Sequence, residues 1–394
     1  MNVQTRNWPE FFEDKQIVFY AGGIVVGGVF ACFLPMGLFA SLAIKNILPI
    51  LLFVTFLQIP VSAILKGFRK TQFITALLVG NFIFVPVFVV LVVGLSEFSL
   101  SQMYPHICDD WKLTGFVLLM ASIPLCAPCV DCVVSFCRVA KGDAASLTAA
   151  LPVLLFVQFV IFMCSMFLTN LGDHSVSDGF GTSLKFLFDI LPIMILPISC
   201  ASLLQLGSKR NKRIHHATDL MKHSVILVTA LTLMFIASYA VSEILEKLHI
   251  RYYFFEDIFF SGNGGAYIAE EDLNTLSQKQ KSNNELASFY AYLNIAFFYA
   301  FYACSAPFIG MLTAKIFKLA RPQAIAVIFS LSTRNSLVIL PWLLFMFSKS
   351  VEGQIAVVIL TQTCIELIAE IFYVQLIPRY VKKHFGCQET ELER

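Results

Sequence analysis

Two charged residues stand inside stretches of the chain that are otherwise apolar. Asp131 belongs to GFVLLMASIPLCAPCVDCVVSFCRVAKGD, and Arg334 belongs to AIAVIFSLSTRNSLVILPWLLFMF. A charge at the centre of a bilayer costs about 2.5–3.5 kcal/mol, so such residues usually face a protein interior and are paired or functional. We expect the two charged groups to lie within about 6 Å of each other, either as a structural ion pair or as part of a binding site.

Neighbouring residues add a thiol and further polar groups. Cys129 lies between Pro128 and Asp131, and its thiolate would bind a soft, thiophilic solute. Cys126 and Cys132 flank it at three-residue spacing, but this string lacks a fourth ligand, so we expect neither a bound metal nor another cofactor. The second stretch is interrupted at its middle by Ser332, Thr333, Arg334, Asn335 and Ser336. We predict a substrate site formed by Cys129, Asp131, Arg334, Asn335 and Ser336.

Carboxyl groups at membrane depth could carry a proton. Asp131 is the first candidate, because the guanidinium of Arg334 always stays protonated. Glu366 is the second candidate, and it recurs with Gln362 and Glu370 every four residues along one face of the last apolar stretch. Two interpretations of Glu366 stay open: a proton site, or an acceptor for the unwound backbone of a neighbouring helix.

The composition excludes several classes of protein. Of 394 residues, 58% are hydrophobic and only 14% are charged, whereas a soluble globular chain carries about 25% charged residues. This excludes an ordinary soluble enzyme and a disordered protein, and the formal charge of +2 supplies no basic field for nucleic acid. The sequence has no phosphate-binding loop, HExxH motif or nucleophile–histidine pair, so we do not expect an enzyme.

Ten segments are long and apolar enough to cross a bilayer, which requires roughly 20 residues each. Their runs are continuous rather than alternating, so we predict an all-α polytopic membrane protein. Asn81 and Gln158, in the third and fifth segments, are expected to hydrogen-bond other helices. The predicted spans are Ile17–Leu34, Asn46–Leu65, Phe73–Leu95, Gly115–Ala140, Ala144–Leu168, Leu184–Leu206, His223–Leu245, Tyr290–Ile316, Ala324–Phe347 and Ile355–Ile377.

The distribution of Lys and Arg predicts the orientation. The gaps after the second, fourth, sixth and eighth spans and the tail 378–394 are basic, and the other short gaps are poor in basic residues. By the positive-inside rule the basic segments and both termini are cytoplasmic. Residues 1–16 lack the basic region of a cleavable signal, so we do not expect a cleaved signal peptide. We expect a multi-pass protein of the plasma (inner) membrane. The long gap 246–289 is expected to be an external insertion, partly mobile.

Two spans are predicted to be broken, in a pattern that suggests a repeat. Residues 17–168 and 184–377 hold five spans each, an odd number, so two related halves must be inverted in the membrane. The fourth span of one half carries Pro124 and Pro128, and the fourth span of the other carries the polar interruption. Unwound backbone is tolerated in a membrane only where it lines a cavity or is buried in protein. We therefore expect the two breaks to cross inside the bundle and to form the site.

The stretches that form these breaks resemble a known family. APCVD, STRNSLVILP and the following VVILTQTCIELIAEIFYVQLIPR resemble the arsenite permeases of the bile acid:sodium symporter superfamily, in the branch of arsenic resistance proteins. The resemblance implies a core domain of spans three to five and eight to ten, and a panel domain of spans one, two, six and seven. It also implies a secondary active transporter that exports trivalent arsenic in exchange for protons, with Cys129 as the thiol of the family's motif.

The chain departs from that family at a position that matters for ion coupling. Its members carry a Glu in the ninth span, and the matching position here is Ser336. The sodium-coupled members also carry a Gln one turn later, where Leu340 stands. Sodium is therefore a less favoured coupling ion than the proton, and we expect Asp131 to supply the displaced carboxylate.

Two transport functions stay open. An exporter of a metalloid oxyacid would depend on Cys129, because arsenite is a neutral hydroxide at neutral pH and has more use for a thiol than for a cation. A transporter of small organic anions would depend on Arg334. A receptor or scaffold is a third class, which unbroken fourth and ninth helices would favour. For either transporter the partners are a small-molecule substrate, a coupling ion and the lipid bilayer, without nucleic acid.

Overall fold

Helices make up almost all of the chain that the structure describes. This computed structural model describes residues 15–33, 37–58, 71–103, 120–130, 132–173, 196–208, 211–247, 271–346 and 351–385. No β-strand occurs within these ranges. The all-α prediction is therefore confirmed for the described residues.

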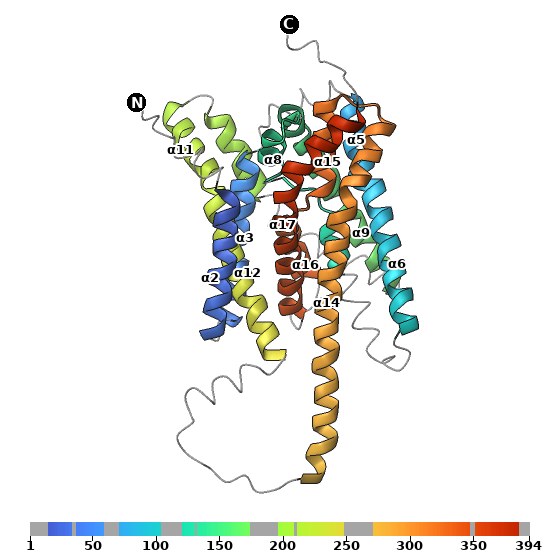
Figure 1. Ribbon diagram of the computed structural model, residues 1–394. Coiled ribbons are helices and arrows are strands. Elements are labelled where there is room, and N and C mark those ends of the chain that lie inside the picture. Colours follow the sequence, from blue (N-terminus) through green and yellow to red (C-terminus); the bar gives the residue numbers. More distant parts are fainter. Residues whose placement is uncertain are drawn as a thin grey trace, which may run out of the picture.

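Figure 1 shows how the helices follow one another along the chain. In order they are α2 (Gln16–Phe33), α3 (Gly37–Gln58), α5 (Thr71–Val79), the π-helical turn η1 (Gly80–Phe84), α6 (Val85–Met103), α8 (Val133–Val139), α9 (Ala144–Asp173), α11 (Lys212–His223), α12 (Val225–Lys247), α14 (Glu271–Ile316), α15 (Arg321–Ser332), α16 (Ser336–Met346) and α17 (Glu352–His384). Residues 120–125 and Leu196–Ser208 form further helical pieces.

Seven helices in the described part of the chain are long and apolar enough to cross a membrane. They are Gln16–Phe33, Phe39–Gln58, Thr71–Leu95, Ala144–Phe162, Lys212–Glu246, Ala291–Ile316 and Glu352–His384. The chain is thus a polytopic membrane protein that is helical throughout its described part. The predicted fourth, sixth and ninth spans are described only as shorter helical pieces, so the total of ten spans stays a prediction.

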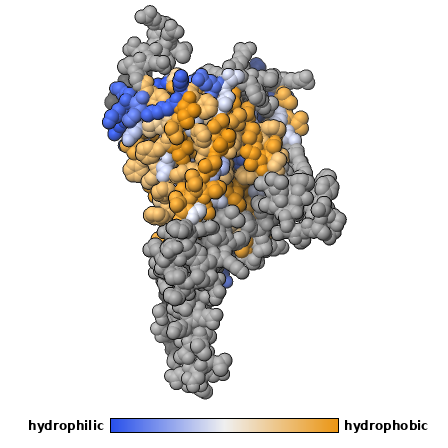
Figure 2. Space-filling view, turned by 90° about the vertical axis from the view of Figure 1, so that its right-hand side faces the viewer, coloured by the Kyte–Doolittle hydropathy of each residue, from blue (hydrophilic) through white to orange (hydrophobic). Residues whose placement is uncertain are grey.

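The outer surface of these helices is apolar. Phe297, Val90 and Leu203, for example, are 72%, 70% and 68% exposed. Figure 2 shows a broad hydrophobic body, with hydrophilic residues gathered at the upper end of the molecule. In water, exposed apolar surface costs roughly 25 cal/mol per Å², whereas lipid tails are as apolar as these side chains. This surface is therefore the one that a bilayer requires.

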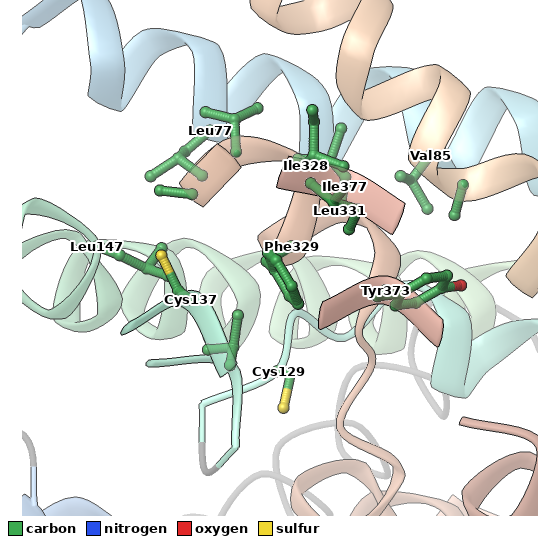
Figure 3. Close-up of a cluster of buried hydrophobic side chains, with 14 of the residues drawn as sticks. Leu77, Val85, Cys129, Cys137, Leu147, Ile328, Phe329, Leu331, Tyr373 and Ile377 are labelled. Atoms are coloured by element: carbon green, nitrogen blue, oxygen red, sulfur yellow. The ribbon is translucent and has the colours of Figure 1, made fainter. Parts of the chain in front are cut away.

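The helices pack in two groups, and α17 lies between them. α2, α3 and α12 pack on one another around buried side chains that include Leu51 and Leu233. α5, α6, α8, α9, α14 and α15 surround a second apolar cluster that includes Phe73 and Phe329, part of which Figure 3 shows. α17 contacts both α12 and α14 and contributes side chains to both clusters. Figure 1 shows its ribbon near the centre of the bundle.

The long helix α14 departs from the predicted boundaries. The predicted span begins at Tyr290 and the preceding residues are expected to be a loop, but one helix runs over Glu271–Ile316. Figure 1 shows its first part projecting beyond the bundle. The added segment, EDLNTLSQKQKSNNELASF, contains no Gly or Pro and several strong helix formers, so it extends the apolar helix that follows it. The rest of the predicted insertion lies outside the described residues.

Both predicted helix breaks are present, and they cross. The helical piece at residues 120–125 ends before Cys126, and α8 begins at Val133. α15 ends at Ser332, and α16 begins at Ser336. Pro128 and Arg334 form an isolated antiparallel bridge, and Asn335 N donates to Ala127 O over 3.1 Å. The prediction that the two breaks meet inside the bundle is confirmed.

Candidate functional site

Prolines account for the first break. Pro128 has no N–H and cannot continue a helix. The chain leaves the helical piece through a turn in which Ala127 N donates to Pro124 O over 3.1 Å, and helix resumes only at Val133. Cys129 is therefore carried on non-helical backbone that lies against the break in the other half of the chain.

Polar side chains account for the second break. Thr333 has an extended backbone (φ −102°, ψ 139°), and its hydroxyl donates to the Phe329 carbonyl over 2.8 Å. Asn335 then caps α16, since its Oδ1 accepts a hydrogen bond from Val338 N at 3.0 Å. Asn is among the residues favoured at a helix N-cap. The string Thr-Arg-Asn thus ends one helix and starts the next while satisfying backbone groups at both ends.

Arg334 is buried in the protein and held by neutral groups. Its Nε donates to the Tyr302 hydroxyl at 2.6 Å, its Nη1 to Asn81 Oδ1 at 2.9 Å and its Nη2 to the Leu331 carbonyl at 2.5 Å. The guanidinium carbon also lies 5.7 Å from the centroid of the Tyr302 ring, within the range of a cation–π interaction. Asn81 is thus a hydrogen-bond partner of another helix, as expected. These contacts join α14, η1 and the end of α15.

Glu366 supports the unwound backbone of the second break. Its Oε1 accepts from Arg334 N at 2.6 Å, and its Oε2 accepts from Gln362 Nε2. Gln362 Nε2 also lies 3.4 Å from Arg334 O. Two neighbours on one face of α17 therefore contact both the N–H and the C=O of Arg334. This is one of the two roles that the sequence left open for Glu366, and the other, proton transfer, stays a prediction.

Cys129 and Cys132 form a pair of thiols beside Glu370. Their Sγ atoms are 3.2 Å apart, and Cys132 Sγ donates to Glu370 Oε1 over 3.0 Å. Because the Cys132 thiol donates its hydrogen bond to the carboxyl group, Cys129 is the donor in the contact between the two sulfurs. Glu370 is fully buried, and its Oε2 has no hydrogen-bond partner among the described residues. In Figure 3 the Cys129 sulfur is directed away from Phe329 and Cys137.

A cavity of about 410 Å³, including the space at its mouth, brings these groups together. One wall is formed by the two breaks and α17, and the other by side chains of α2 and α12, among them Tyr20 and Thr229. Both lie near the start of their helices, so the cavity lies in the half of the bundle where α2 and α12 begin. Because that figure counts the open space at the mouth, the enclosed part is smaller and suits only a small solute.

The predicted site residues meet at this cavity where the structure describes them. The cavity is lined by Cys129, Arg334, Asn335, Ser336 and the second proton candidate, Glu366. Asp131 lies outside the described residues, so its predicted approach to Arg334 stays untested. Gln158, expected to bond another helix, has an Oε1 without a hydrogen-bond partner in the described part of the chain.

Cys132, Glu370 and Tyr302 were not predicted to belong to the site. The spacing of the three cysteines offers Cys126 and Cys132 equally as partners of Cys129, and only the fold distinguishes them, since Cys126 Sγ contacts Ser122 O at 3.7 Å instead. Glu370 had only a weak signal in the sequence, namely its place in the row that Gln362, Glu366 and Glu370 form along one face of α17. Tyr302 carried no signal, because nothing in the sequence separates it from the other tyrosines of the chain.

Cys129, Cys132 and Glu366 together offer the ligands that a thiophilic metal or metalloid ion prefers. Cys129 Sγ, Cys132 Sγ and a carboxylate oxygen of Glu366 all lie within 4.8 Å of one another. The cysteine string by itself lacks a fourth ligand, but α17 adds Glu366 and Glu370 beside it. Sulfur and carboxylate together suit a soft or borderline centre.

In comparisons with known proteins, no protein-family model matches the chain, and no curated protein matches it. The family resemblance of the two broken spans therefore contributes to a proposal only.

Proposed function

We propose that the chain is a secondary active transporter that exports a trivalent metalloid, arsenite first of all, in exchange for protons. The observation that carries this proposal is the pair of thiols beside a small cavity where two broken helices cross. Broken helices near the middle of the membrane are a recurrent plan of secondary transporters, because half-helix ends offer free backbone groups to a solute. Thiolates add the soft ligands that a thiophilic solute needs.

The proposal includes an architecture. The chain would have ten spans in two inverted repeats, with α2, α3, α12 and Leu196–Ser208 in a panel domain and the remaining spans in a core domain. The two packed groups of helices support this division. Helix ends that carry Arg138, Arg321 and Lys383 lie at the upper end in Figure 1. By the positive-inside rule, this end and both termini would face the cytoplasm of a plasma-membrane protein.

A neutral substrate fits this site better than an organic anion. The guanidinium of Arg334 donates to three protein groups from a position that is 3% exposed. An organic anion would have to draw these donors away from Tyr302, Asn81 and the Leu331 carbonyl. Arsenous acid is neutral and needs no such cation, and it exchanges its hydroxides for sulfur.

Arsenite resistance of a sensitive host tests the proposal. We expect the wild-type chain to raise the arsenite concentration that the host tolerates and to lower its arsenic content, and Cys129→Ser to abolish both effects. Cys304→Ser is the matched control, because this thiol is exposed on α14 and does not line the cavity. Full resistance with Cys129→Ser would overturn the proposal. Uptake of an organic anion that is lost in Arg334→Gln but kept in Cys129→Ser would establish the anion transporter instead.

A further inference from the structure

We infer that Cys129 and Cys132 act together as a dithiol that binds the trivalent metalloid through two sulfur atoms, with Glu370 as the group that accepts the proton of Cys132. This inference rests on the proposed function, because it specifies how the same site holds its substrate. It assigns Cys132 and Glu370 to substrate binding, next to Cys129.

The separation of the two sulfurs fits a pyramidal centre. A three-coordinate arsenic(III) atom bonds at angles close to a right angle, so two sulfurs bound to it lie near van der Waals contact. The observed Sγ–Sγ distance is 3.2 Å. A tetrahedral zinc ion with bonds of about 2.3 Å would hold two sulfurs roughly 3.8 Å apart. The thiols therefore stand closer to the arrangement of the metalloid than to that of the metal ion.

The hydrogen bonds give the reaction a direction. The contacts run from Cys129 through Cys132 to Glu370 Oε1, while Glu370 Oε2 is buried and lacks a partner among the described residues. A thiolate, rather than a thiol, is the nucleophile toward such a centre. Glu370 can take the proton of Cys132 as its sulfur attacks, and Oε2 can then meet a hydroxide of the bound solute.

The atoms balance without an oxidant or reductant. Arsenous acid, As(OH)₃, reacts with two thiols to give (RS)₂AsOH and two water molecules. Two As–O bonds break and two As–S bonds form, arsenic stays trivalent, and each thiol proton leaves with a hydroxide as water. Glu370 ends the binding step in the protonation state in which it began. Reversal of these steps releases the solute.

A second sulfur bond strengthens binding because it forms within one molecule. The effective concentration of a linked second ligand typically raises the overall affinity roughly 10²–10⁴-fold. An arsenical with two exchangeable positions gains this advantage, and an arsenical with one exchangeable position does not. This difference separates a dithiol site from a single reactive thiol.

The test uses the purified full chain and phenylarsine oxide, whose arsenic binds two thiols. We expect wild type to retain one phenylarsenic group through a wash with excess monothiol and to release it to dimercaptopropanol. Cys132→Ser and Cys129→Ser should lose that retained group. Cys126→Ser is the matched control, because Cys126 stands at the same spacing from Cys129 but bonds Ser122 O, so this variant should behave as wild type. Glu370→Gln should keep the adduct but form it more slowly.

Two further measurements keep the test decisive. Dimethylarsinous acid, with one exchangeable position, should still label Cys129 in Cys132→Ser, which shows that the variant is folded with its site intact. Retention of the phenylarsenic group in Cys132→Ser, or its loss in Cys126→Ser, would overturn the dithiol. Protection of both thiols by Zn²⁺ in a chain that does not retain phenylarsine oxide would also overturn it and assign a metal site.

The inference and the proposed function can fail separately. Resistance that requires Cys129 but survives Cys132→Ser would refute the dithiol and leave the transporter standing. Retention of phenylarsine oxide that needs both thiols, in a chain that gives no arsenite resistance, would support the dithiol and refute metalloid export.

Discussion

Arg334 and the thiols illustrate two ways in which single polar residues are accommodated at membrane depth. The guanidinium is stabilised by three neutral acceptors and one aromatic ring, so its burial is matched by hydrogen bonds rather than by a carboxylate among the described residues. The thiols are weakly polar and need no such network. They are therefore the groups that remain available to a solute, while Arg334 fixes the backbone that carries them.

Replacement of Arg334 by Lys tests this structural role. The ammonium keeps the charge but cannot reproduce the planar fork that reaches Tyr302, Asn81 and Leu331 at once. Buried acceptors left without donors cost about 1–3 kcal/mol, so we expect a clear fall in the unfolding temperature of the detergent-solubilised chain. Tyr302→Phe removes one of the acceptors and should have a smaller effect. An unchanged stability of Arg334→Lys would show that the fork is dispensable.

Proton coupling is the second prediction at this scale. We expect Asp131→Asn to abolish arsenite transport driven by a pH gradient in everted vesicles, while arsenite exchange without a gradient persists. Glu366→Gln should retain gradient-driven transport, because its amide oxygen can still accept from Arg334 N or from Gln362, with the loss of one hydrogen bond worth about 1 kcal/mol. The opposite pattern in the two variants would transfer the proton to Glu366.

The sequence marks some of these residues more clearly than others, for a physical reason. Arg334 and Cys129 are conspicuous because a charge or a thiol inside an apolar run stands out by its type alone. The partnership of Cys129 with Cys132, and of both with Glu370, depends on how the break turns and how α17 lies against it. Spacing along the chain leaves that geometry undetermined. Tyr302 accepts a hydrogen bond from Arg334 only because its helix, α14, lies beside the second break.

Close backbone contact between helices is the main feature at the level of elements. On α2, a Cβ atom added to Gly23 or Gly27 would clash with the backbone carbonyl of Ala230 or Met234 on α12. The Ser238 hydroxyl also donates to the Gly27 carbonyl over 2.9 Å. Small residues four apart are typical of such interfaces between membrane helices, where close packing replaces the hydrophobic effect.

Four glycines on one helix provide an internally controlled test of this packing. Gly27→Ala should destabilise the chain by about 1–3 kcal/mol, because overpacking forces the two helices apart. Gly22→Ala meets nothing within 4 Å, and Gly28→Ala meets only a Val241 methyl at 3.8 Å. These two controls should be neutral or stabilising, by up to about 1 kcal/mol, since Ala favours helix over Gly by that amount. Equal effects at Gly22 and Gly27, measured by thermal unfolding in the same detergent, would contradict this account of the interface.

The elements themselves were predictable where local chemistry decides them. Prolines at 124 and 128 and the string Ser332–Ser336 marked both breaks, since helix termination is a local property. The start of α14 was missed because its first residues are polar. Hydropathy separates polar from apolar residues, but it does not separate a polar helix from a polar loop. The family resemblance places α2 and α12 in one domain, but the glycine contact between them was not predicted, because two glycines in an apolar run do not indicate which helix they face.

At the scale of the whole molecule, the cavity and an ion pair lie toward opposite ends of the bundle. The cavity lies in the half where α2 and α12 begin. Near the other end, Lys45 of α3 contacts Glu352 in the first turn of α17 at 2.8 Å, and the Ser41 hydroxyl donates to the same carboxylate over 3.1 Å. Fourteen residues separate Glu352 from Glu366, about 21 Å along the helix. These contacts thus tie α3, a helix of the first group, to the central helix α17 on the side away from the cavity.

A transporter that opens its site to each side of the membrane in turn must break the contact between Lys45 and Glu352 during its cycle. Glu352 is 6% exposed and the Lys45 side chain 41% exposed, so the pair is weaker than a buried one and stronger than a surface one, on the order of 1–2 kcal/mol. We expect Glu352→Gln to shift the population toward the state open at the other end by roughly tenfold, since 1.4 kcal/mol is a factor of ten.

A small, charged thiosulfonate that cannot cross the membrane measures the shift, with labelled Cys129 identified by peptide mass. Wild type should be labelled mainly in everted vesicles, and Glu352→Gln from the outside of intact cells as well. The double variant Lys45→Glu/Glu352→Lys should restore the wild-type pattern, and Glu246→Gln, at an exposed site at the same end, should leave it unchanged. Labelling of Glu352→Gln that stays confined to everted vesicles would show that this contact does not hold the two groups together, and that closure at this end rests on apolar packing alone.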